Sequence, residues 1–511
     1  MTFEIVFVLL SLLGMVAALV ADKMRPGMIL FSVVVLFLCA GILTPKEMLE
    51  GFSNKGMITV ALLFLVSEGI RQSGTLGQVI KKLLPQGKTT VFKAQLRILP
   101  SVAFISAFLN NTPVVVIFAP IIKHWAKSVN LPATKFLIPL SYVTILGGIC
   151  TLIGTSTNLV VHGMILEAGF EGFSMFELGK VGIFIAIAGI IYIFLFSKRL
   201  LPDARPDTAV PDEEVEEGEK LHRVEAVLGA RFPGINKKLK DFNFQRHYGA
   251  EVKEIKTRNG QRFVSNLEDV VLHEGDTLVV MADDTFIPTW GESSVFVLLT
   301  NGNEPDTTGK KKRWFALLLL VLMIVGATVG ELPVTKEMFP DIKLDMFFFV
   351  SITTIIMAWT NLFPARKYTK YISWDILITI ACAFAISKAM VNSGVADSVA
   401  KFIIGLSDDY GPHVLLAMLF IITNLFTELI TNNAAAALAF PLALSIASQL
   451  GVSPTPFFVV ICMAASASFS TPIGYQTNLI VQGIGNYKFT DFVRIGLPLN
   501  IITFLISIIL I

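Results

Sequence analysis

Long apolar runs, separated by short polar stretches, recur along the chain. Five of them precede residue 203, at positions 3–20, 28–43, 56–70, 136–168 and 177–197. Five more follow residue 309, at positions 314–330, 344–361, 375–390, 455–485 and 493–511. A helix needs about 17 to 25 apolar residues to cross a bilayer. The pattern therefore predicts an all-α polytopic membrane protein with five spans in each half.

Two further apolar segments, 98–122 and 414–447, are interrupted in their middle by polar residues. The interruptions read Asn110-Asn111-Thr112-Pro113 and Thr431-Asn432-Asn433. A break at membrane depth is tolerated only where protein covers the backbone or where the backbone lines a wet cavity. We therefore expect each segment to form a re-entrant hairpin that enters the membrane and returns on the same side.

A polar motif inside an apolar run occurs twice at the same spacing. Gly154, Thr157 and Asn158 recur, 320 positions later, as Gly474, Thr477 and Asn478. Such a duplication is typical of transporters built from internal repeats. Because each half has an odd number of spans, the second copy enters the membrane in the opposite orientation. The sequence thus predicts inverted repeats over 1–202 and 310–511.

The composition supports this interpretation. Of the 511 residues, 54% are hydrophobic and 16% are charged, and the mean hydropathy of +0.69 exceeds what a soluble core of that length uses. The net charge of +2 is too small to indicate a nucleic-acid partner. Lysine and arginine gather in alternate loops, which assigns the sides of the membrane. We expect both termini outside a cell membrane and residues 203–309 in the cytoplasm.

Residues 203–309 form a separate unit between the repeats. A proline- and acid-rich linker opens it, and short alternating segments at 222–228 and 250–256 predict the strands of a small α+β domain. Its turn Glu274-Gly275-Asp276, which leads into an apolar strand, is similar to the C-terminal domain of the potassium-uptake regulator family (TrkA-C). That resemblance implies a regulatory domain that binds a small-molecule ligand; an ordered spacer is the alternative.

The polar interruptions indicate an ion-binding site. Broken helices free backbone carbonyl groups, which together with Asn and Thr oxygens can replace the water around a small cation. The N–H groups at the N-termini of half-helices attract an anion without any fixed positive side chain. A cation and an anion can therefore share one site. The sequence has no HExxH motif, phosphate-cradling loop or nucleophile elbow, which argues against an enzyme.

Taken together, the four motifs resemble those of the divalent anion/sodium symporters. That family has two hairpins tipped by a Ser-Asn-Thr-like motif and two unwound segments, and the corresponding motifs occur here in the same order. The resemblance implies sodium-coupled import of a dianion by an elevator-like movement, in a homodimer and without an organic cofactor.

The resemblance also implies the residues that form the site. One sodium ion would be held by Asn111 with the turn from Gly154 to Asn158, and the other by Asn432 with the turn from Gly474 to Asn478. The anion would lie between the hairpin tips. Its binding residues would be Asn110, Asn111, Thr112, Ser156, Thr157, Thr431, Asn432, Asn433 and Thr477.

Departures from the family pattern bear on the substrate. Dicarboxylate carriers resemble one another in having prolines before the Asn of the unwound segment, whereas this chain has Ser156-Thr157 and Gln476-Thr477. Extra hydroxyl and amide groups suit a compact oxyanion, so sulfate is favoured and a C4-dicarboxylate comes next.

Three alternatives stay open at this point: a proton-coupled carrier, an exchanger or efflux pump for another oxyanion, and an ion channel regulated by the insert. Glu428, near the second tip, fits either proton-sensitive gating or a structural hydrogen bond.

Overall fold

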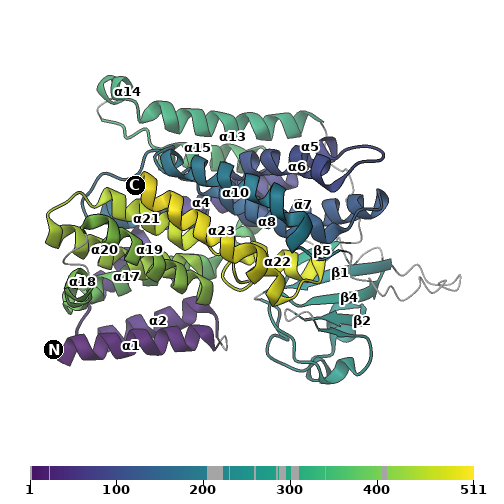
Figure 1. The fold of residues 1–511 in the computed structure, drawn as a ribbon, viewed down its shortest axis with the longest axis horizontal. Coiled ribbons are helices and arrows are strands. Elements are labelled where there is room, and N and C mark those ends of the chain that lie inside the picture. The colour runs from purple at the N-terminus through teal and green to yellow at the C-terminus, as the bar shows by residue number, and fades with distance from the viewer. Residues whose placement is uncertain are drawn as a thin grey trace, which may run out of the picture.

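The protein consists of two sets of helices with a small sheet inserted between them in the chain (Figure 1). The computed structural model describes residues 3–21, 24–203, 222–229, 231–257, 261–283, 286, 290, 295–300, 310–339, 341–405 and 411–511. The predicted linker after residue 203 lies mostly outside these residues.

The first set of helices begins near the N-terminus. Its α-helices are α1 (Phe3–Val20), α2 (Pro26–Cys39), α3 (Pro45–Glu50), α4 (Lys55–Gln72), α5 (Thr75–Leu83), α6 (Val91–Ser106), α7 (Asn111–Ser128), α8 (Leu137–Gly148), α9 (Ser156–Glu167) and α10 (Gly179–Leu200). Short 3₁₀ turns lie at η1 (Gly51–Ser53) and η2 (Ala133–Lys135).

The second set follows the insert and has the same order of long helices. Its α-helices are α13 (Lys310–Gly330), α14 (Pro333–Met338), α15 (Met346–Trp359), α16 (Tyr368–Tyr371), α17 (Trp374–Asn392), α18 (Val395–Gly405), α19 (Pro412–Leu429), α20 (Asn432–Leu450), α21 (Thr455–Ser466), α22 (Gln476–Gly485) and α23 (Phe489–Leu510), with a 3₁₀ turn at η5 (Ala365–Lys367). Gly74 (φ 69°) precedes α5 and Gly394 (φ 75°) precedes α18. Both glycines adopt the left-handed backbone that a side chain would strain, so the two turns match as well.

The predicted fold class is confirmed, with helix boundaries that differ in detail. The apolar runs 136–168 and 455–485 are each two helices, α8 with α9 and α21 with α22, separated by the segments 149–155 and 467–475. The hairpin arms extend beyond the predicted 98–122 and 414–447. The short helices α5 and α18 were not predicted, because they are amphipathic and too brief to stand out as apolar runs.

Several long helices carry apolar side chains on the outer surface of the protein. Seven helices in the described part of the chain are long and apolar enough to cross a membrane, among them α1, α10, α13 and α23. Leu10 of α1 is 63% exposed and Leu318 of α13 is 52% exposed. Such faces are stable in lipid, where the helical backbone satisfies its own hydrogen bonds.

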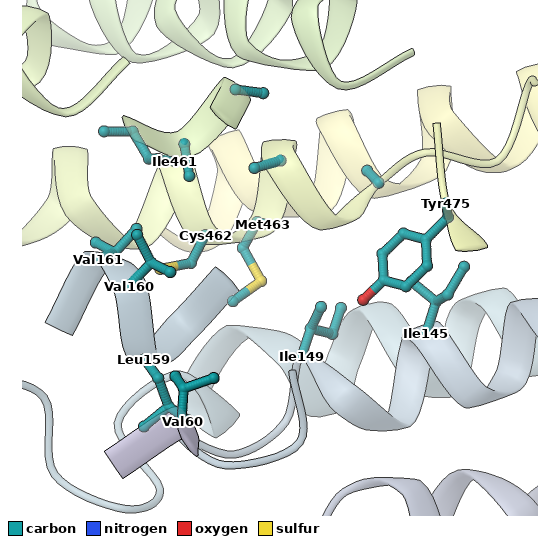
Figure 2. Close-up of a cluster of buried hydrophobic side chains, with 14 of the residues drawn as sticks. Val60, Ile145, Ile149, Leu159, Val160, Val161, Ile461, Cys462, Met463 and Tyr475 are labelled. Carbon is teal, nitrogen blue, oxygen red and sulfur yellow. The ribbon is translucent and has the colours of Figure 1, made fainter. Parts of the chain in front are cut away.

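The buried core lies where the two sets of helices meet. Helix α17 packs on α2, α15 packs on α4, and α10 packs on α23. Figure 2 shows part of this core, with Val60 of α4 beside Leu159 of α9 and with Tyr475 beside Ile145. The helical breaks are therefore enclosed by apolar side chains from both sets.

The insert is a five-stranded antiparallel sheet in the order β3-β2-β4-β1-β5. Its strands are β1 (His222–Leu228), β2 (Glu251–Lys256), β3 (Arg262–Phe263), β4 (Thr277–Ala282) and β5 (Phe296–Thr300), and its helical turns are η3 (Leu239–Asp241), α11 (Phe244–Tyr248) and η4 (Leu267–Asp269). One face holds an apolar core that includes Phe232, Phe244 and Ile255. The predicted strands at 222–228 and 250–256 agree with β1 and β2.

The insert lies at one end of the helical part, and both termini lie at the other end (Figure 1). In that view α13 and α1 run along opposite sides of the helices, and α22 lies next to the sheet.

Candidate functional site

The first helical break, between α8 and α9, is held by hydrogen bonds to its own backbone. The Thr151 hydroxyl donates to the carbonyl oxygen of Ala107, and the Gly154 N–H donates to Thr151 Oγ1 at 3.2 Å. Asn158 Nδ2 donates to the carbonyl oxygens of Thr151 (2.9 Å) and Gly148 (3.4 Å). These bonds tie the hairpin end, the unwound segment and the start of α9 into one unit.

The second break, between α21 and α22, repeats this pattern with residues 320 or 321 positions later. Thr471 Oγ1 donates to the carbonyl oxygen of Glu428 at 3.1 Å and accepts from the Gly474 N–H at 3.3 Å. Asn478 Nδ2 donates to the carbonyl oxygens of Ser468 (2.8 Å) and Thr471 (3.2 Å). The duplication in the sequence thus corresponds to two equivalent hydrogen-bonding arrangements.

Both motif glycines lie where a side chain does not fit. A Cβ atom on Gly154 would lie 2.5 Å from the carbonyl oxygen of Gly148, and one on Gly474 would overlap Ser468 Oγ and the carbonyl oxygen of Thr427. Real Cβ atoms do not approach oxygen that closely, so the tight unwound backbone requires glycine at both positions.

The first hairpin tip reaches both breaks through Asn111. This residue is 1% exposed and bonds to Ser106 Oγ at 2.8 Å. With the amide oriented so that its oxygen accepts from Tyr475 Oη at 2.6 Å, its nitrogen donates to the carbonyl oxygens of Gly154 (3.2 Å) and Thr144 (3.0 Å). Asn111 therefore contacts the Gly154 to Asn158 turn, with which the sequence comparison had grouped it.

The second hairpin tip contacts the start of α9. Asn432 Nδ2 donates to Thr157 Oγ1 at 2.7 Å, and Asn433 Oδ1 accepts from the hydroxyls of Ser156 and Thr157, each at 3.2 Å. The Thr431 hydroxyl is buried and has no hydrogen-bond partner among the described residues. Asn432, which the sequence paired with the Gly474 to Asn478 turn, bonds to the first half of the protein and also interacts with the Tyr475 hydroxyl of that turn.

The remaining predicted residues lie around these tips. Thr112 Oγ1 donates to Gln476 Oε1 at 3.2 Å, which links the first tip to the start of α22. Asn110 lines a cavity of about 10 Å³ together with Ser156 and other residues, which is about the volume that one water molecule needs. Thr477 Oγ1 accepts a hydrogen bond from Ser141 at 2.8 Å, so its hydroxyl is held by α8.

The contacts cross between the two halves. The tip that begins α7 bonds to the start of α22, and the tip that begins α20 bonds to the start of α9. The N-termini of four helices thus meet at one place inside the helical part. Each N-terminus carries partial positive charge from its unsatisfied N–H groups, so this place favours a negatively charged ligand.

Comparison with known proteins identifies the family. The sequence profile of the family described as citrate transporter (CitMHS) matches residues 16–449 and 338–511. The chain belongs to this family. The protein is accordingly a multi-pass membrane transporter, and the resemblance to divalent anion/sodium symporters is confirmed.

Relatives of the citrate transporter family match over nearly the whole chain. An uncharacterized transporter of Synechocystis is 30% identical over 556 residues, covering 92% of this chain and 90% of the relative. The probable sodium/sulfate cotransporter 3 of Chlamydomonas reinhardtii is 23% identical over 774 residues, covering 94% of this chain and 85% of the relative. The crystal structure of the YdaH transporter of Alcanivorax borkumensis is similar in fold, with a TM-score of 0.52 at 12% identity, over 91% of this chain and 86% of that one.

Tyr475 also belongs to the candidate site of this citrate transporter family member, although the sequence motifs did not indicate it. Its hydroxyl bonds to Asn111 (2.6 Å) and to Thr155 Oγ1 (2.9 Å). It stands 320 positions after Thr155, so an aromatic ring replaces a small hydroxyl side chain in the second copy of the motif. That difference between the copies was visible in the sequence and could have marked the position.

Glu428 provides a carboxylate at the second break alone. Its Oε1 accepts from the Ser470 N–H (2.9 Å) and Asn500 Nδ2 (2.7 Å), and its Oε2 accepts from Ser468 Oγ (3.4 Å). At the first break, the carbonyl that accepts the equivalent threonine hydroxyl belongs to Ala107. The two breaks therefore share a backbone pattern but differ in that a carboxyl group lies at the second.

Proposed function

We propose that the protein couples the import of a divalent anion to sodium. The observation that carries this proposal is the crossing of the two hairpin tips with the two helical breaks, through Asn111 with Tyr475 (2.6 Å) and Asn432 with Thr157 (2.7 Å). The crossing brings four helix N-termini together, and these supply positive potential without a fixed cation. A dianion bound there needs accompanying cations to offset its charge in a site away from water.

We propose two sodium sites, one at each break. The first comprises Asn111, Gly154 and Asn158, and the second comprises Asn432, Gly474 and Asn478. Support comes from the backbone carbonyls at both breaks, which are hard oxygen ligands of the kind that small cations prefer. The Asn111 amide already lies against the Gly154 carbonyl, whereas Asn432 would exchange its bond to Thr157 for the second site.

We propose sulfate as the favoured substrate, with a C4-dicarboxylate next. The anion would contact the amides and hydroxyls at the crossing, namely Asn110, Thr112, Ser156, Thr157, Thr431, Asn433 and Thr477. Two observations support an anion at this place. The Thr431 hydroxyl is buried without a partner among the described residues, and Ser156 lies at the N-terminus of α9. The name of the Chlamydomonas relative, a probable sodium/sulfate cotransporter, points to the same substrate.

We propose an elevator-type movement of two inverted repeats, in a homodimer. The group formed by α6 to α10 and α19 to α23 would carry the site, and the group of α1, α2, α4, α13, α15 and α17 would stay fixed. The equal order of helices in the two sets and the shared end of both termini (Figure 1) support this interpretation. The insert would be cytoplasmic and would regulate transport, in keeping with its resemblance to TrkA-C domains.

Uptake into proteoliposomes tests the proposal. Radiolabelled sulfate and succinate are offered separately, each with an inward sodium gradient and with a potassium control. We expect sulfate accumulation that requires sodium and that excess unlabelled sulfate suppresses. If succinate but not sulfate were taken up, the sulfate assignment would be wrong and a dicarboxylate would be the substrate. Equal uptake with and without the sodium gradient would refute sodium coupling.

A proton-coupled carrier is the second candidate, because of the Glu428 carboxylate at the second break. This carboxylate accepts its hydrogen bonds from neutral donors, Ser470, Asn500 and Ser468. The same proteoliposomes with an inward proton gradient and no sodium distinguish the two candidates, since only a proton-coupled carrier accumulates substrate there.

A further inference from the structure

The helices that follow the two breaks, α9 and α22, have different neighbours on corresponding faces. Helix α9 packs on α4, and Gly163 marks the contact. A Cβ atom on Gly163 would lie 2.6 Å from Asn54 Oδ1, while Asn54 Nδ2 donates to the carbonyl oxygen of Gly163 (3.3 Å) and to Glu167 (3.0 Å). Gly56 of α4 is equally close, since its Cβ would lie 2.9 Å from the Cα atom of Gly163.

The corresponding face of α22 contacts the insert. Gly483 stands 320 positions after Gly163, and a Cβ atom there would lie 2.6 Å from Thr277 Oγ1 and 3.1 Å from the carbonyl oxygen of Gly275. A Cβ atom on Gly275 would in turn lie 2.5 Å from Leu479 Cγ. Helix α17 corresponds to α4, and within the described residues α22 makes no packing with α17 comparable to that of α9 with α4.

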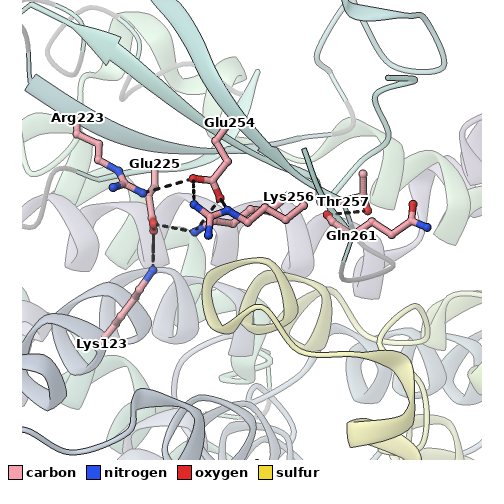
Figure 3. A network of polar contacts seen from close by, with 8 residues as sticks. Lys123, Arg223, Glu225, Glu254, Lys256, Thr257 and Gln261 are labelled. Atoms are coloured by element: carbon pink, nitrogen blue, oxygen red, sulfur yellow. Dashed lines mark hydrogen bonds and ion pairs between the residues drawn. The ribbon is translucent and has the colours of Figure 1, made fainter. Parts of the chain in front are cut away.

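The insert also reaches the start of α17 and the first hairpin. Arg231 Nη2 donates to the carbonyl oxygen of Ile372, two residues before α17 begins, at 3.3 Å. On the other side, Lys123 Nζ of α7 lies 3.0 Å from both carboxylate oxygens of Glu225 on β1, and Lys256 Nζ lies 3.4 Å from one of them (Figure 3). The sheet is thus fixed to α7 and α22 and touches the segment that leads into α17.

We propose that the inserted sheet is a wedge, which occupies the space that α17 would take against α22 and thereby holds the transporter in one of its two states. The inference rests on the proposed elevator movement of inverted repeats. In such a protein the two halves exchange their arrangements between states, so the other state brings α22 against α17 and moves α9 away from α4. The turn at Gly275 to Thr277 stands in the way of that contact. It must leave α22 before the transporter can change state.

A reversible covalent bond between the turn and α22 tests the wedge. The Cβ atom built on Gly483 lies 3.9 Å from Thr277 Cβ, within the about 3.5–4.5 Å that a disulfide needs. Thr277→Cys and Gly483→Cys are combined in a full-length chain whose four native cysteines are replaced by alanine. We expect sulfate uptake to be lost after oxidation and restored by reduction, while each single variant is insensitive to oxidant. Undiminished uptake by the cross-linked protein would overturn the proposal.

A second measurement does not depend on the substrate. Val60 of α4 is 2% exposed and lies beside Leu159 of α9 (Figure 2), so a thiol introduced by Val60→Cys is accessible only when α9 leaves α4. Maleimide modification of that position, quantified by peptide mass spectrometry, should slow after cross-linking and recover after reduction. An unchanged rate would refute the wedge even if the wild type carries no sulfate, and absent sulfate uptake with the expected labelling would refute only the substrate assignment.

Weakening the contacts that hold the insert on α22 and α7 should have the opposite effect on maleimide labelling. Gly483→Ala places a methyl group 2.6 Å from Thr277 Oγ1, and Lys123→Gln removes the ion pair with Glu225. Both should increase labelling of the thiol introduced by Val60→Cys. Lys127→Gln, one turn further along α7, is the matched control and should not change it. Equal labelling in all three variants would contradict the wedge.

Discussion

At the scale of single residues, Asn111 connects the first hairpin tip to both breaks. Its amide lies between the carbonyl of Gly154 and the hydroxyl of Tyr475, so one side chain contacts the proposed cation site of the first half and the unwound segment of the second. Losing a buried hydrogen-bonding group costs about 1–3 kcal/mol, which makes this residue the most direct test of the first cation site.

Replacing Asn111 by alanine should weaken sodium binding more than anion binding. The substitution removes an oxygen ligand and the bond to Gly154, and about 1–3 kcal/mol corresponds to roughly a five- to 150-fold rise in the sodium concentration for half-maximal uptake. The measurement is sulfate uptake against sodium concentration. A sodium response equal to that of the wild type would remove Asn111 from the cation site.

Tyr475→Phe should weaken anion transport and leave the fold intact. The ring stays packed in the core, whereas the hydroxyl that bonds to Asn111 and Thr155 is lost. A net hydrogen bond is worth about 1 kcal/mol, so we expect roughly a fivefold rise in the KM for sulfate. Tyr192→Phe is the control, because its hydroxyl bonds to the Ile495 carbonyl of α23, outside the hairpin tips and the breaks. Equal effects of both variants would deny Tyr475 a role at the site.

Residues that are unusual among their neighbours in the chain are easier to predict from sequence than residues that act through distant partners. The Asn and Thr residues of the tips and breaks stand out because polar groups are costly in apolar segments. Ser141 and Tyr475 did not stand out, since each matters through partners more than 300 positions away in the chain. Their roles depend on how the halves pack, which spacing along the sequence does not reveal.

At the scale of secondary-structure elements, the two breaks are the features that the sequence predicted most directly. In each break a glycine lies in the unwound segment, the Thr and Asn that follow it lie in the first turn of the next helix, and the Asn side chain bonds to the freed carbonyl of Thr151 or Thr471. The amphipathic helices α5 and α18 and the full length of the hairpin arms were missed, because apolar periodicity carries little information in short elements and at helix ends.

Gly154→Ala should abolish transport by deforming the first break. The added Cβ atom would lie 2.5 Å from the carbonyl oxygen of Gly148 and 3.0 Å from that of Ala107, so the unwound segment must move away from the hairpin. Gly14→Ala is the matched control, since no atom lies within 4 Å of its Cβ position. Uptake per protein in the membrane is measured for both. Wild-type uptake by the Gly154 variant would mean that the break tolerates a side chain.

At the scale of the whole molecule, the insert joins elements that belong to different parts of the proposed mechanism. Its sheet bonds to α7 through Glu225, contacts α22 through Gly275, and reaches the start of α17 through Arg231. The sequence predicted a separate α+β unit but could not indicate where it attaches, because the contacts involve turns and surface charges without a recognisable pattern. The insert therefore connects helices that would move in the proposed mechanism with a helix that would stay fixed.

The ion pair that attaches the insert should be insensitive to pH in the physiological range. Burial raises the pKa of Glu225, but the charges of Lys123 and Lys256 outweigh this effect and lower the pKa from 4.5 to about 2. A carboxyl group whose pKa is lower in the folded state stabilises that state above its ordinary pKa and loses this effect as the pH falls toward the lowered value. The contribution, on the order of 3 kcal/mol, is therefore complete above about pH 5.5.

Thermal unfolding of the purified protein and of Glu225→Gln, measured from pH 8 to pH 4, tests this expectation. The wild type should be the more stable of the two by a constant margin between pH 8 and pH 5.5, and the margin should begin to narrow only as the pH approaches 4.5. The control is Glu251→Gln, whose ion pair with Lys253 is exposed and so contributes little. A margin that narrows between pH 7.5 and pH 6 would show that another group, not this carboxylate, holds the insert on α7.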